Sequence, residues 1–352
     1  MKPVPVSALK SFVLQVLAQC GVSPEDAETS AEVLVTTDTW GVFTHGTKSL
    51  YAYARRLREG GLQPRGKPRV VNGGPAWSLV DGDSSLGMVT GVYAMKLAIA
   101  KAAESGIAMV VVRNSCHFGA AGYYASLAAS CGQLGLAVSN DVPSVAAPGS
   151  LGPVLGSNPF AFGAPSAHEG AMILDMATAE VAGGKVAAAA AEGKAVPSRW
   201  LFDQKGQPTS DPQLFVERKA YLAPMSGYKG YGLGLMIEIL SAGLSGAAMR
   251  DEVGLWMHDP KSIATDHSHA FIAINPGVFL GDNVFPGRLD RLFSGIRGGP
   301  AAAGPLKIAG EIEEEKRQKA LVSGIDLPDE VRRLLRTAAE ENGCPMPAFL
   351  VS

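Results

Sequence analysis

The chain between residues 110 and 124 reads Val110-Val111-Val112-Arg113-Asn114-Ser115-Cys116-His117-Phe118-Gly119-Ala120-Ala121-Gly122-Tyr123-Tyr124. The unbroken apolar run from Ile107 to Val112 predicts a buried strand, and residues 120–131 predict a helix. The polar segment between them therefore lies at the carboxyl end of a strand, which is where open α/β sheets bind ligands. Gly119 and Gly122 let the backbone approach a ligand there, and the N–H groups that open the helix favour an anionic group such as a pyrophosphate.

The composition describes a soluble globular α/β protein and excludes several functions. The chain has 352 residues, of which 47% are hydrophobic and 42 are glycine, so it can form a large core and more than one domain. A net charge of -2 gives no electrostatic case for binding nucleic acid or an acidic membrane surface. No apolar run reaches the roughly 20 residues that a membrane-spanning helix needs, and no signal peptide is apparent. Because its four cysteines show no metal spacing, we expect reduced thiols in the cytoplasm.

Both ends of the chain are predicted to be helical. We expect Ser7 to cap a first helix, Ser23-Pro24 to open a second and Gly60-Gly61 to close a third. Between the two ends, short apolar runs alternate with alanine-rich helices, which argues for a layered α/β domain. Residues 297–305 resemble a linker, and a capped helix that begins near residues 326–330 is expected to pack with the N-terminal helices.

A histidine in a break between two predicted helices is the first candidate for chemistry. His45 lies between the hydroxyl of Thr44 and Gly46. One interpretation is structural, a histidine in a turn that bonds to the backbone. The other is a general acid/base, because imidazole titrates near neutrality and can exchange a proton with a carbinol or carbonyl oxygen. The residues alone leave both interpretations open.

Three further polar stretches have a structural and a functional interpretation. Residues 139–159, rich in proline and glycine, predict a long irregular loop of a length that is often functional. Asp175 follows a short predicted strand and is expected to cap the next helix. In Asp266-His267-Ser268-His269 two histidines could share a metal, but a closed site needs three or four ligands and no second cluster is present. We therefore expect no metal, and a polar loop before an apolar strand at residues 270–274.

The signatures of two enzyme classes are missing. No Gly-x-Gly-x-x-Gly follows a predicted strand, and Gly230-Tyr231-Gly232-Leu233-Gly234 has the wrong spacing for a Rossmann dinucleotide site. The Gly-x-Ser-x-Gly elbow of a serine hydrolase is also absent. Cys116 lies beside His117, but nothing else in the sequence supports a thiolate nucleophile.

Six separated motifs nevertheless point to one family. The run from Asn114 to Tyr124 closely resembles the loop that marks the malate/L-lactate dehydrogenase family, which comprises nicotinamide-dependent 2-hydroxyacid dehydrogenases and 2-imino-acid reductases. The other motifs, in the family's order, are Thr44-His45-Gly46, Leu155-Gly156-Ser157-Asn158-Pro159, Asp175-Met176-Ala177-Thr178, Lys229-Gly230-Tyr231-Gly232-Leu233 and Ala309-Gly310-Glu311. Together they span nearly the whole chain.

The resemblance implies a sulfolactate dehydrogenase-like α/β fold. Its mixed-sheet NAD(P)-binding domain lacks a Rossmann fingerprint and is accompanied by a helical domain formed from both chain ends. We expect a helical part at residues 1–70, the α/β cofactor-binding domain at 71–296, and a linker and C-terminal helix at 297–352.

The resemblance also implies roles for single residues. His45 becomes the acid/base of hydride transfer, with Thr44 beside it. Ser49 stands where many members carry an arginine that binds the substrate carboxylate, so Lys48, Ser49, Ser157 and, as a further candidate, Arg199 are expected to contact substrate. The implied cofactor contacts are His117, Phe118, Gly119, Ala120, Ala121, Asp175, Met176, Ala177, Thr178, Gly184, Lys185, Lys229, Gly230, Gly310 and Glu311.

The expected function is that of an NAD- or NADP-dependent oxidoreductase, which moves hydride between nicotinamide and C2 of a small, malate- or lactate-like 2-hydroxy or 2-oxo acid. Some imino-acid reductases carry an aspartate at the position of Lys185, so the lysine favours the hydroxyacid branch. Two alternatives stay open: a cyclic 2-imino-acid reductase of the piperideine- or pyrroline-2-carboxylate type, and a cofactor-binding protein that has lost catalysis. Since the family forms interlocked dimers, we expect a homodimer in the cytoplasm.

Overall fold

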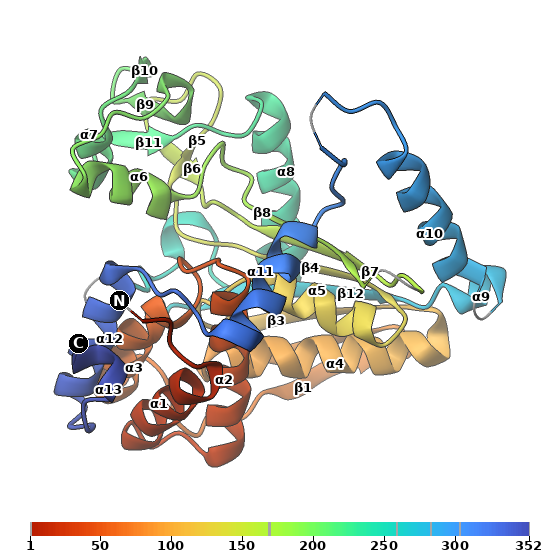
Figure 1. Ribbon diagram of the computed structural model, residues 1–352, viewed down its shortest axis with the longest axis horizontal. Helices are drawn as coiled ribbons and strands as arrows, with labels where there is room; N and C mark the ends of the chain where they lie inside the picture. The colour runs from red at the N-terminus through yellow and green to blue at the C-terminus, as the bar shows by residue number, and fades with distance from the viewer. Residues whose placement is uncertain (1, 168–169, 258–259, 282–283, 303, 352) are drawn as a thin grey trace.

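The computed structural model describes residues 2–167, 170–257, 260–281, 284–302 and 304–351. A seven-stranded sheet crosses the middle of the molecule, a layer of helices from both chain ends lies on one side of it, and a smaller five-stranded sheet forms a separate lobe (Figure 1). In this part of the chain we find no helix whose length and apolar character would let it cross a membrane.

The large sheet is mixed, with the strand order β1-β2-β3-β12-β4-β7-β8. Strands β2 and β3 are parallel, and the other neighbours are antiparallel. A strand from late in the sequence, β12, thus lies between β3 and β4. The strands are β1 (Arg69–Gly74), β2 (Trp77–Asp81), β3 (Ile107–Ser115), β4 (Leu134–Ser139), β7 (Phe160–Ala164), β8 (Met172–Met176) and β12 (His267–Ile274).

Both faces of the large sheet are covered, which explains the unbroken valine run in β3. Helices α4 (Gly87–Ser105) and α5 (Ala121–Ser130) cover one face, where Val110 and Val112 join the main core. Alternate side chains point to the other face, where Val111 packs with Ile237 of α8 (Tyr228–Glu238). Each valine buried in this way stabilises the fold by about 1.5–3 kcal/mol.

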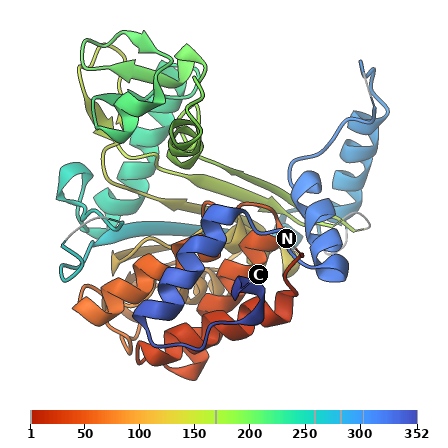
Figure 2. The same cartoon turned by 60° about the vertical axis from the view of Figure 1, so that its left-hand side comes forward.

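The helical layer joins the two ends of the chain (Figures 1 and 2). The buried guanidinium of Arg332 donates to the carbonyls of Lys2, Leu327 and Phe349, at 2.9, 3.2 and 2.8 Å. The C-terminal segment is therefore bonded to the N-terminus through one side chain. The helices of this layer are α1 (Val6–Gln19), α2 (Pro24–Thr39), α3 (Leu50–Glu59), α11 (Glu311–Ser323), α12 (Asp329–Glu341) and α13 (Ala348–Val351).

The predicted helix starts are half right. Ser23 caps α2 by accepting from the Asp26 N–H at 3.2 Å, with Pro24 at the first helical position, as predicted. The expectation for Ser7 is wrong, because α1 begins one residue earlier, at Val6, and Pro5 stands at the cap position. Proline has no side-chain acceptor, so α1 starts without a side-chain cap.

The smaller sheet has the strand order β10-β9-β11-β5-β6. Two of its strands come from residues 139–159, so the prediction of an irregular loop there is wrong in part; each is too short to show periodicity. The elements of this lobe are β5 (Val145–Ala146), β6 (Pro153–Leu155), α6 (Gly183–Ala191), β9 (Leu201–Asp203), β10 (Pro208–Thr209), α7 (Pro212–Val216) and β11 (Ala220–Leu222). Helices α9 (Gly277–Leu280) and α10 (Val284–Arg297) project from the opposite end of the large sheet (Figure 1).

The predicted polar loop at Asp266-His267-Ser268-His269 is also wrong. His267 and His269 belong to β12 and are buried in the middle of the large sheet. They tolerate burial because their ring nitrogens are hydrogen-bonded: those of His269 lie 2.9 Å from the hydroxyls of Ser139 and Ser115. Periodicity could not show this, since the bonding partners come from other strands.

Candidate active site

A cleft of about 2840 Å³ lies where the helical layer, the large sheet and the smaller lobe meet. Thr178, Lys229 and Gly230 are not among the described residues that line it. The predicted site residues that do line the cleft are Thr44, His45, Lys48, Ser49, His117, Phe118, Gly119, Ala120, Ala121, Ser157, Asp175, Met176, Ala177, Gly184, Lys185, Arg199, Gly310 and Glu311.

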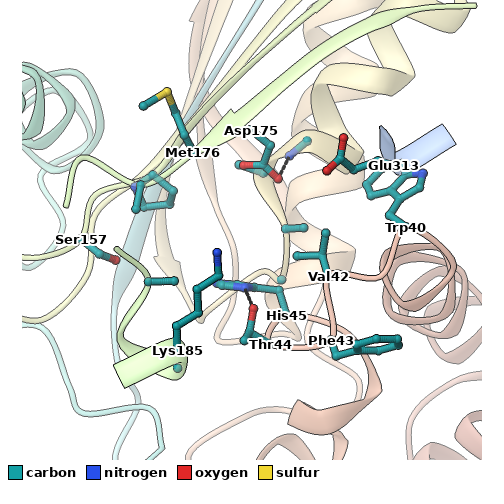
Figure 3. A pocket seen from close by; sticks show the side chains of 18 of the residues that line it. Trp40, Val42, Phe43, Thr44, His45, Ser157, Asp175, Met176, Lys185 and Glu313 are labelled. Carbon is teal, nitrogen blue, oxygen red and sulfur yellow. Dashed lines mark hydrogen bonds between the residues drawn. The ribbon is translucent and has the colours of Figure 1, made fainter. Parts of the chain in front are cut away.

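His45 is presented to the cleft by the turn that follows α2. Its Nδ1 lies 2.8 Å from the Thr44 hydroxyl, which leaves Nε2 for a ligand (Figure 3). Burial lowers the pKa of His45 below the usual 6.5; the nearby Asp141 carboxylate opposes this shift and Lys48 adds to it. The imidazole is therefore neutral near pH 7 and can accept a proton.

The buried carboxylate of Asp38, which the sequence analysis missed, is hydrogen-bonded to this turn. The backbone N–H and the hydroxyl of Thr47 both donate to Asp38 Oδ2. Burial raises the pKa of Asp38 to about 7, although these two bonds lower it. A Cβ on Gly46 would lie 1.9 Å from Asp38 Oδ1. Glycine after the histidine is thus required for the close approach of the carboxylate.

His117 is neutral and forms part of a stack of rings. Its ring lies on Trp256, with centroids 4.0 Å apart and planes inclined by 8°, and its centroid is 5.6 Å from that of His45. Burial, with the nearby histidines, lowers the pKa of His117 well below 6.5. Burial also raises the pKa of Tyr53 well above 10, so this hydroxyl keeps its proton and donates to His117 Nδ1 at 2.6 Å.

At the start of α5, where an anionic group was expected, one backbone N–H is already bonded to a carboxylate of the protein. The Gly122 N–H donates to Asp175 Oδ2 at 2.9 Å, so a carboxylate of the protein occupies that position. Asp175 belongs to β8 and caps α5, whereas it was expected to cap the helix after its own strand. Burial deep in the cleft raises its pKa to about 6, while the Gly122 bond lowers it. One face of the side chain remains open to the cleft.

Two of the predicted cofactor contacts are held in structural roles. The Phe118 ring points into the core, where it stacks on His269 with centroids 4.4 Å apart. Glu311 pairs with Arg297 and accepts from the Ile308 N–H at 2.8 Å, at the start of α11. Their roles as cofactor contacts remain predictions.

The segment before α11 lies close to the backbone of strand β8. Gly310 has a φ of +94°, and a Cβ there would lie 2.9 Å from the backbone nitrogen of Ile173. The neighbouring Ala309 carbonyl accepts from that same N–H at 3.0 Å, so the segment lies along the edge strand β8. A glycine suits this left-handed, crowded position.

Three basic side chains that line the cleft differ in whether they form an ion pair. Lys48 pairs with Glu330 at 2.9 Å, and Arg199 pairs with Glu180 at 2.9 Å. The Lys185 amine has no acidic partner among the residues that the structure describes, and it points into the cleft beside His45 and opposite Ser157 (Figure 3). Its helix, α6, packs so closely that a Cβ on Gly184 would lie 2.9 Å from Thr44 Cγ2.

The chain belongs to the malate/L-lactate dehydrogenase family, whose model matches residues 4–336. It is therefore a dehydrogenase of the non-Rossmann type that the six motifs indicated. L-sulfolactate dehydrogenase from Methanocaldococcus jannaschii is 36% identical over 342 residues, which cover 97% of either chain. Its solved structure superposes with a TM-score of 0.89 at 34% identity, covering 97% of this chain and 98% of that chain. The predicted sulfolactate dehydrogenase-like fold is thus confirmed.

Other relatives differ in the substrates for which they are named. The structure of malate dehydrogenase from Entamoeba histolytica superposes with a TM-score of 0.92 at 34% identity, covering 98% of this chain and 99% of that chain. Ureidoglycolate dehydrogenase (NAD(+)) from Escherichia coli K12 is 32% identical over 95% of both chains. A Delta(1)-pyrroline-2-carboxylate/Delta(1)-piperideine-2-carboxylate reductase from Pseudomonas putida is 30% identical over 93% of this chain and 94% of its own.

Proposed function

We propose that this protein transfers a hydride between a nicotinamide coenzyme and C2 of a small 2-hydroxy or 2-oxo acid, with His45 as the acid/base. The observation that carries the proposal is His45 in the cleft, with Nδ1 engaged by Thr44 and a ring kept neutral by burial. In oxidation, Nε2 accepts the proton of the substrate hydroxyl as C2 loses hydride. In reduction, the imidazolium returns that proton to the carbonyl oxygen.

The cleft suits a dinucleotide in size and in the form of its wall. Its volume of about 2840 Å³ accommodates a coenzyme together with a small acid. Gly183 and Gly184 form a smooth part of the wall at the start of α6, where N–H groups favour an anionic group. The bound coenzyme, NAD or NADP, supplies the hydride acceptor or donor. The residues that would hold it are the cleft-lining members of the predicted set.

Lys185 takes the place of the missing arginine in this proposal. Ser49 is 1% exposed and has no charge to offer a carboxylate, while Lys48 and Arg199 are each paired with a glutamate. The Lys185 amine, pointing into the cleft beside His45, is free to bind the carboxylate at C1 of the substrate (Figure 3). The hydroxyl of Ser157, which faces the same space, is a further substrate contact.

The test is oxidation of NADH and of NADPH by the purified protein across a panel of 2-oxo acids, with His45→Gln in parallel. Because general acid/base catalysis contributes typically 10²–10⁴-fold, we expect kcat/KM to fall by about that factor in the variant. Coenzyme binding, followed by nicotinamide fluorescence, should be retained. Turnover that is indifferent to His45 would contradict the assignment.

A cyclic 2-imino-acid reductase is the second candidate, favoured by the relative from Pseudomonas putida. There the same His45 would protonate a nitrogen instead of an oxygen. Cyclic imino acids in the same panel separate the two, since the enzyme should turn over one class at least tenfold better. Tight coenzyme binding with no turnover of either class would identify a cofactor-binding protein without catalysis.

We also propose a homodimer that works in the cytoplasm. The outer face of α8 and the π-helical turn Ile239–Gly243 carries exposed apolar side chains, the kind of surface that subunit contacts cover. Those with the largest exposure are Tyr228, Leu235, Met236, Ile239 and Leu244. Its four cysteines are free, which suits a reducing compartment.

A further inference from the structure

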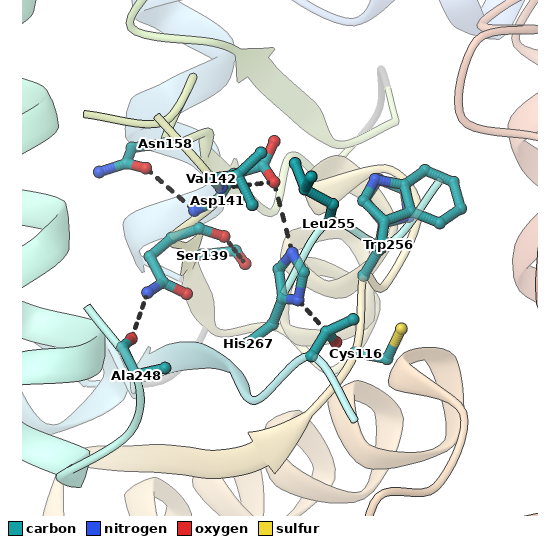
Figure 4. Close-up of polar contacts among 12 residues, drawn as sticks. Cys116, Ser139, Asp141, Val142, Asn158, Ala248, Leu255, Trp256 and His267 are labelled. Carbon is teal, nitrogen blue, oxygen red and sulfur yellow. Dashed lines mark hydrogen bonds and ion pairs between the residues drawn. The ribbon is translucent and has the colours of Figure 1, made fainter. Parts of the chain in front are cut away.

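One carboxylate in the wall of the cleft is not used by the proposed chemistry. Asp141 follows β4 and is close enough to His45 to raise the pKa of that imidazole. Its Oδ1 accepts from the Val142 N–H at 2.8 Å and lies 3.3 Å from His267 Nε2 (Figure 4). Within the described parts of the chain, no hydrogen bond reaches Oδ2, and the side chain is 24% exposed, toward the cleft.

His267 fixes which oxygen of Asp141 faces the cleft. It is 1% exposed in the central strand β12, and its Nδ1 lies 2.9 Å from the Thr265 hydroxyl. A hydroxyl can serve as donor or acceptor to Nδ1, but an ionised carboxylate only accepts, so Nε2 must carry a proton toward Asp141 Oδ1. This contact and the Val142 N–H engage Oδ1 and leave Oδ2 for a ligand.

Part of the cleft wall near this carboxylate is apolar and is anchored by a buried arginine. Figure 4 draws Val142 and Leu255 next to the Asp141 carboxylate, and the apolar wall of the cleft continues through Leu255 and Trp256. The loop of the last two is bonded to the buried Arg56, which donates to the carbonyls of Leu255, Trp256 and Ile263 at 2.6, 2.7 and 2.8 Å. Asp141 thus presents one negative oxygen beside apolar side chains on a loop that is anchored by Arg56.

We infer that Asp141 sets substrate specificity by accepting a hydrogen bond from the group that the substrate carries beyond C2. The preferred substrate is then a 2-hydroxy or 2-oxo acid whose far end is an amide, a ureido group or another neutral or cationic donor. A second acid group at that end is disfavoured, because like charges repel strongly in a half-buried site. This inference rests on the proposed function, since it concerns the substrate on which His45 acts.

The charges of the cleft support this preference. Lys185 is assigned to the carboxylate at C1, and the Lys48 amine and the Arg199 guanidinium already face glutamates. A second acid group next to Asp141 would meet the negative Oδ2 and the apolar side chains of Val142 and Leu255. A donor in the same place would satisfy Oδ2 with a charge-assisted hydrogen bond.

The test uses two 2-oxo acids of matched size. Oxaloacetate ends in a carboxylate, and 2-oxosuccinamate ends in the corresponding amide. For the wild-type protein we expect kcat/KM for the amide to exceed that for the acid at least tenfold, with the difference mostly in KM. Asp141→Asn and Asp141→Ser should each reduce this preference tenfold or more. Asp251→Asn, which removes an 81%-exposed carboxylate outside the cleft, is the matched control and should leave the ratio unchanged.

The possible failures are distinguishable. If the wild type prefers oxaloacetate, or if neither Asp141 variant changes the ratio, the inference is overturned while His45-dependent turnover upholds the proposed function. If no 2-oxo acid is turned over, the proposed function fails, and the inference is then read from binding alone. Calorimetric titration of the coenzyme-loaded protein with succinamate and succinate gives that reading: tighter binding of succinamate supports the inference, and equal or weaker binding refutes it.

Discussion

At the scale of single residues, the site depends on how burial sets the protonation of its histidines. His45 and His117 both have a lowered pKa, and burial is the first cause for each. The Nδ1 of His45 is engaged by the hydroxyl of Thr44 and that of His117 by the hydroxyl of Tyr53, and the His117 ring lies stacked on Trp256. Both histidines therefore line the same cleft in a neutral state, and the acid/base role that we propose for His45 is tested by its pH profile.

The lowered pKa of His45 predicts opposite pH profiles for the two directions of the reaction. Oxidation needs the neutral ring, so kcat/KM should stay level as the pH falls to 6.5 and decline only below it. Reduction needs the imidazolium, so kcat/KM should fall as the pH rises through that same lowered pKa. In Asp141→Asn the inflection should move lower still, because Asp141 raises the pKa of His45. Profiles of initial rate against pH measure both limbs, and a shared inflection above 6.5 would count against His45.

At the scale of elements, the turn between α2 and α3 shows how close packing positions a functional side chain. Asp38, near the end of α2, accepts two hydrogen bonds from Thr47. Its carboxylate also lies against Gly46, the residue that follows the histidine. The turn can keep this shape only with a residue that has no side chain at position 46. Its glycine is thus explained by packing inside the protein.

Gly46→Ala should therefore impair both stability and activity. The new Cβ would lie 1.9 Å from Asp38 Oδ1, so the turn or the carboxylate must move. Overpacking of this kind costs about 1–3 kcal/mol, and displacement of His45 should lower kcat at least tenfold. Denaturant unfolding and steady-state kinetics measure the two effects. Gly295→Ala in α10, where a Cβ meets nothing within 4 Å, is the control. It should leave kcat unchanged and should not lower stability, because alanine is favoured over glycine inside a helix by about 0.5–1 kcal/mol. Equal losses in both variants would exclude this account of the turn.

At the scale of the whole molecule, the apolar face of α8 is the feature that bears on assembly. Ile239 is 55% exposed at the end of this helix, and its neighbours Leu235 and Leu244 are 41% and 54% exposed. A surface of this kind is uncommon on a monomer and is readily covered by a second copy.

Ile239→Glu should convert a dimer to a monomer. Light scattering of the wild type should give twice the 36.5 kDa of one chain, and the variant should give a single copy, because a charge would be buried at the contact. Val322→Glu, at an 88%-exposed apolar position on α11, is the matched control and should remain dimeric. A wild-type protein that is monomeric at micromolar concentration would refute the dimer.

The sequence by itself determined the local elements and the family of this protein. Strand β3 begins at Ile107 as predicted, and β3 and α5 flank the histidine loop, because apolar periodicity and glycine positions are local properties. Only the tertiary structure decided which residues meet in the cleft. Placing β12 between β3 and β4 brings His267 to Asp141 across 126 residues, and Asp175 caps α5 across 53 residues. Such pairs depend on which strands align and in what register, and no local pattern in the chain encodes that.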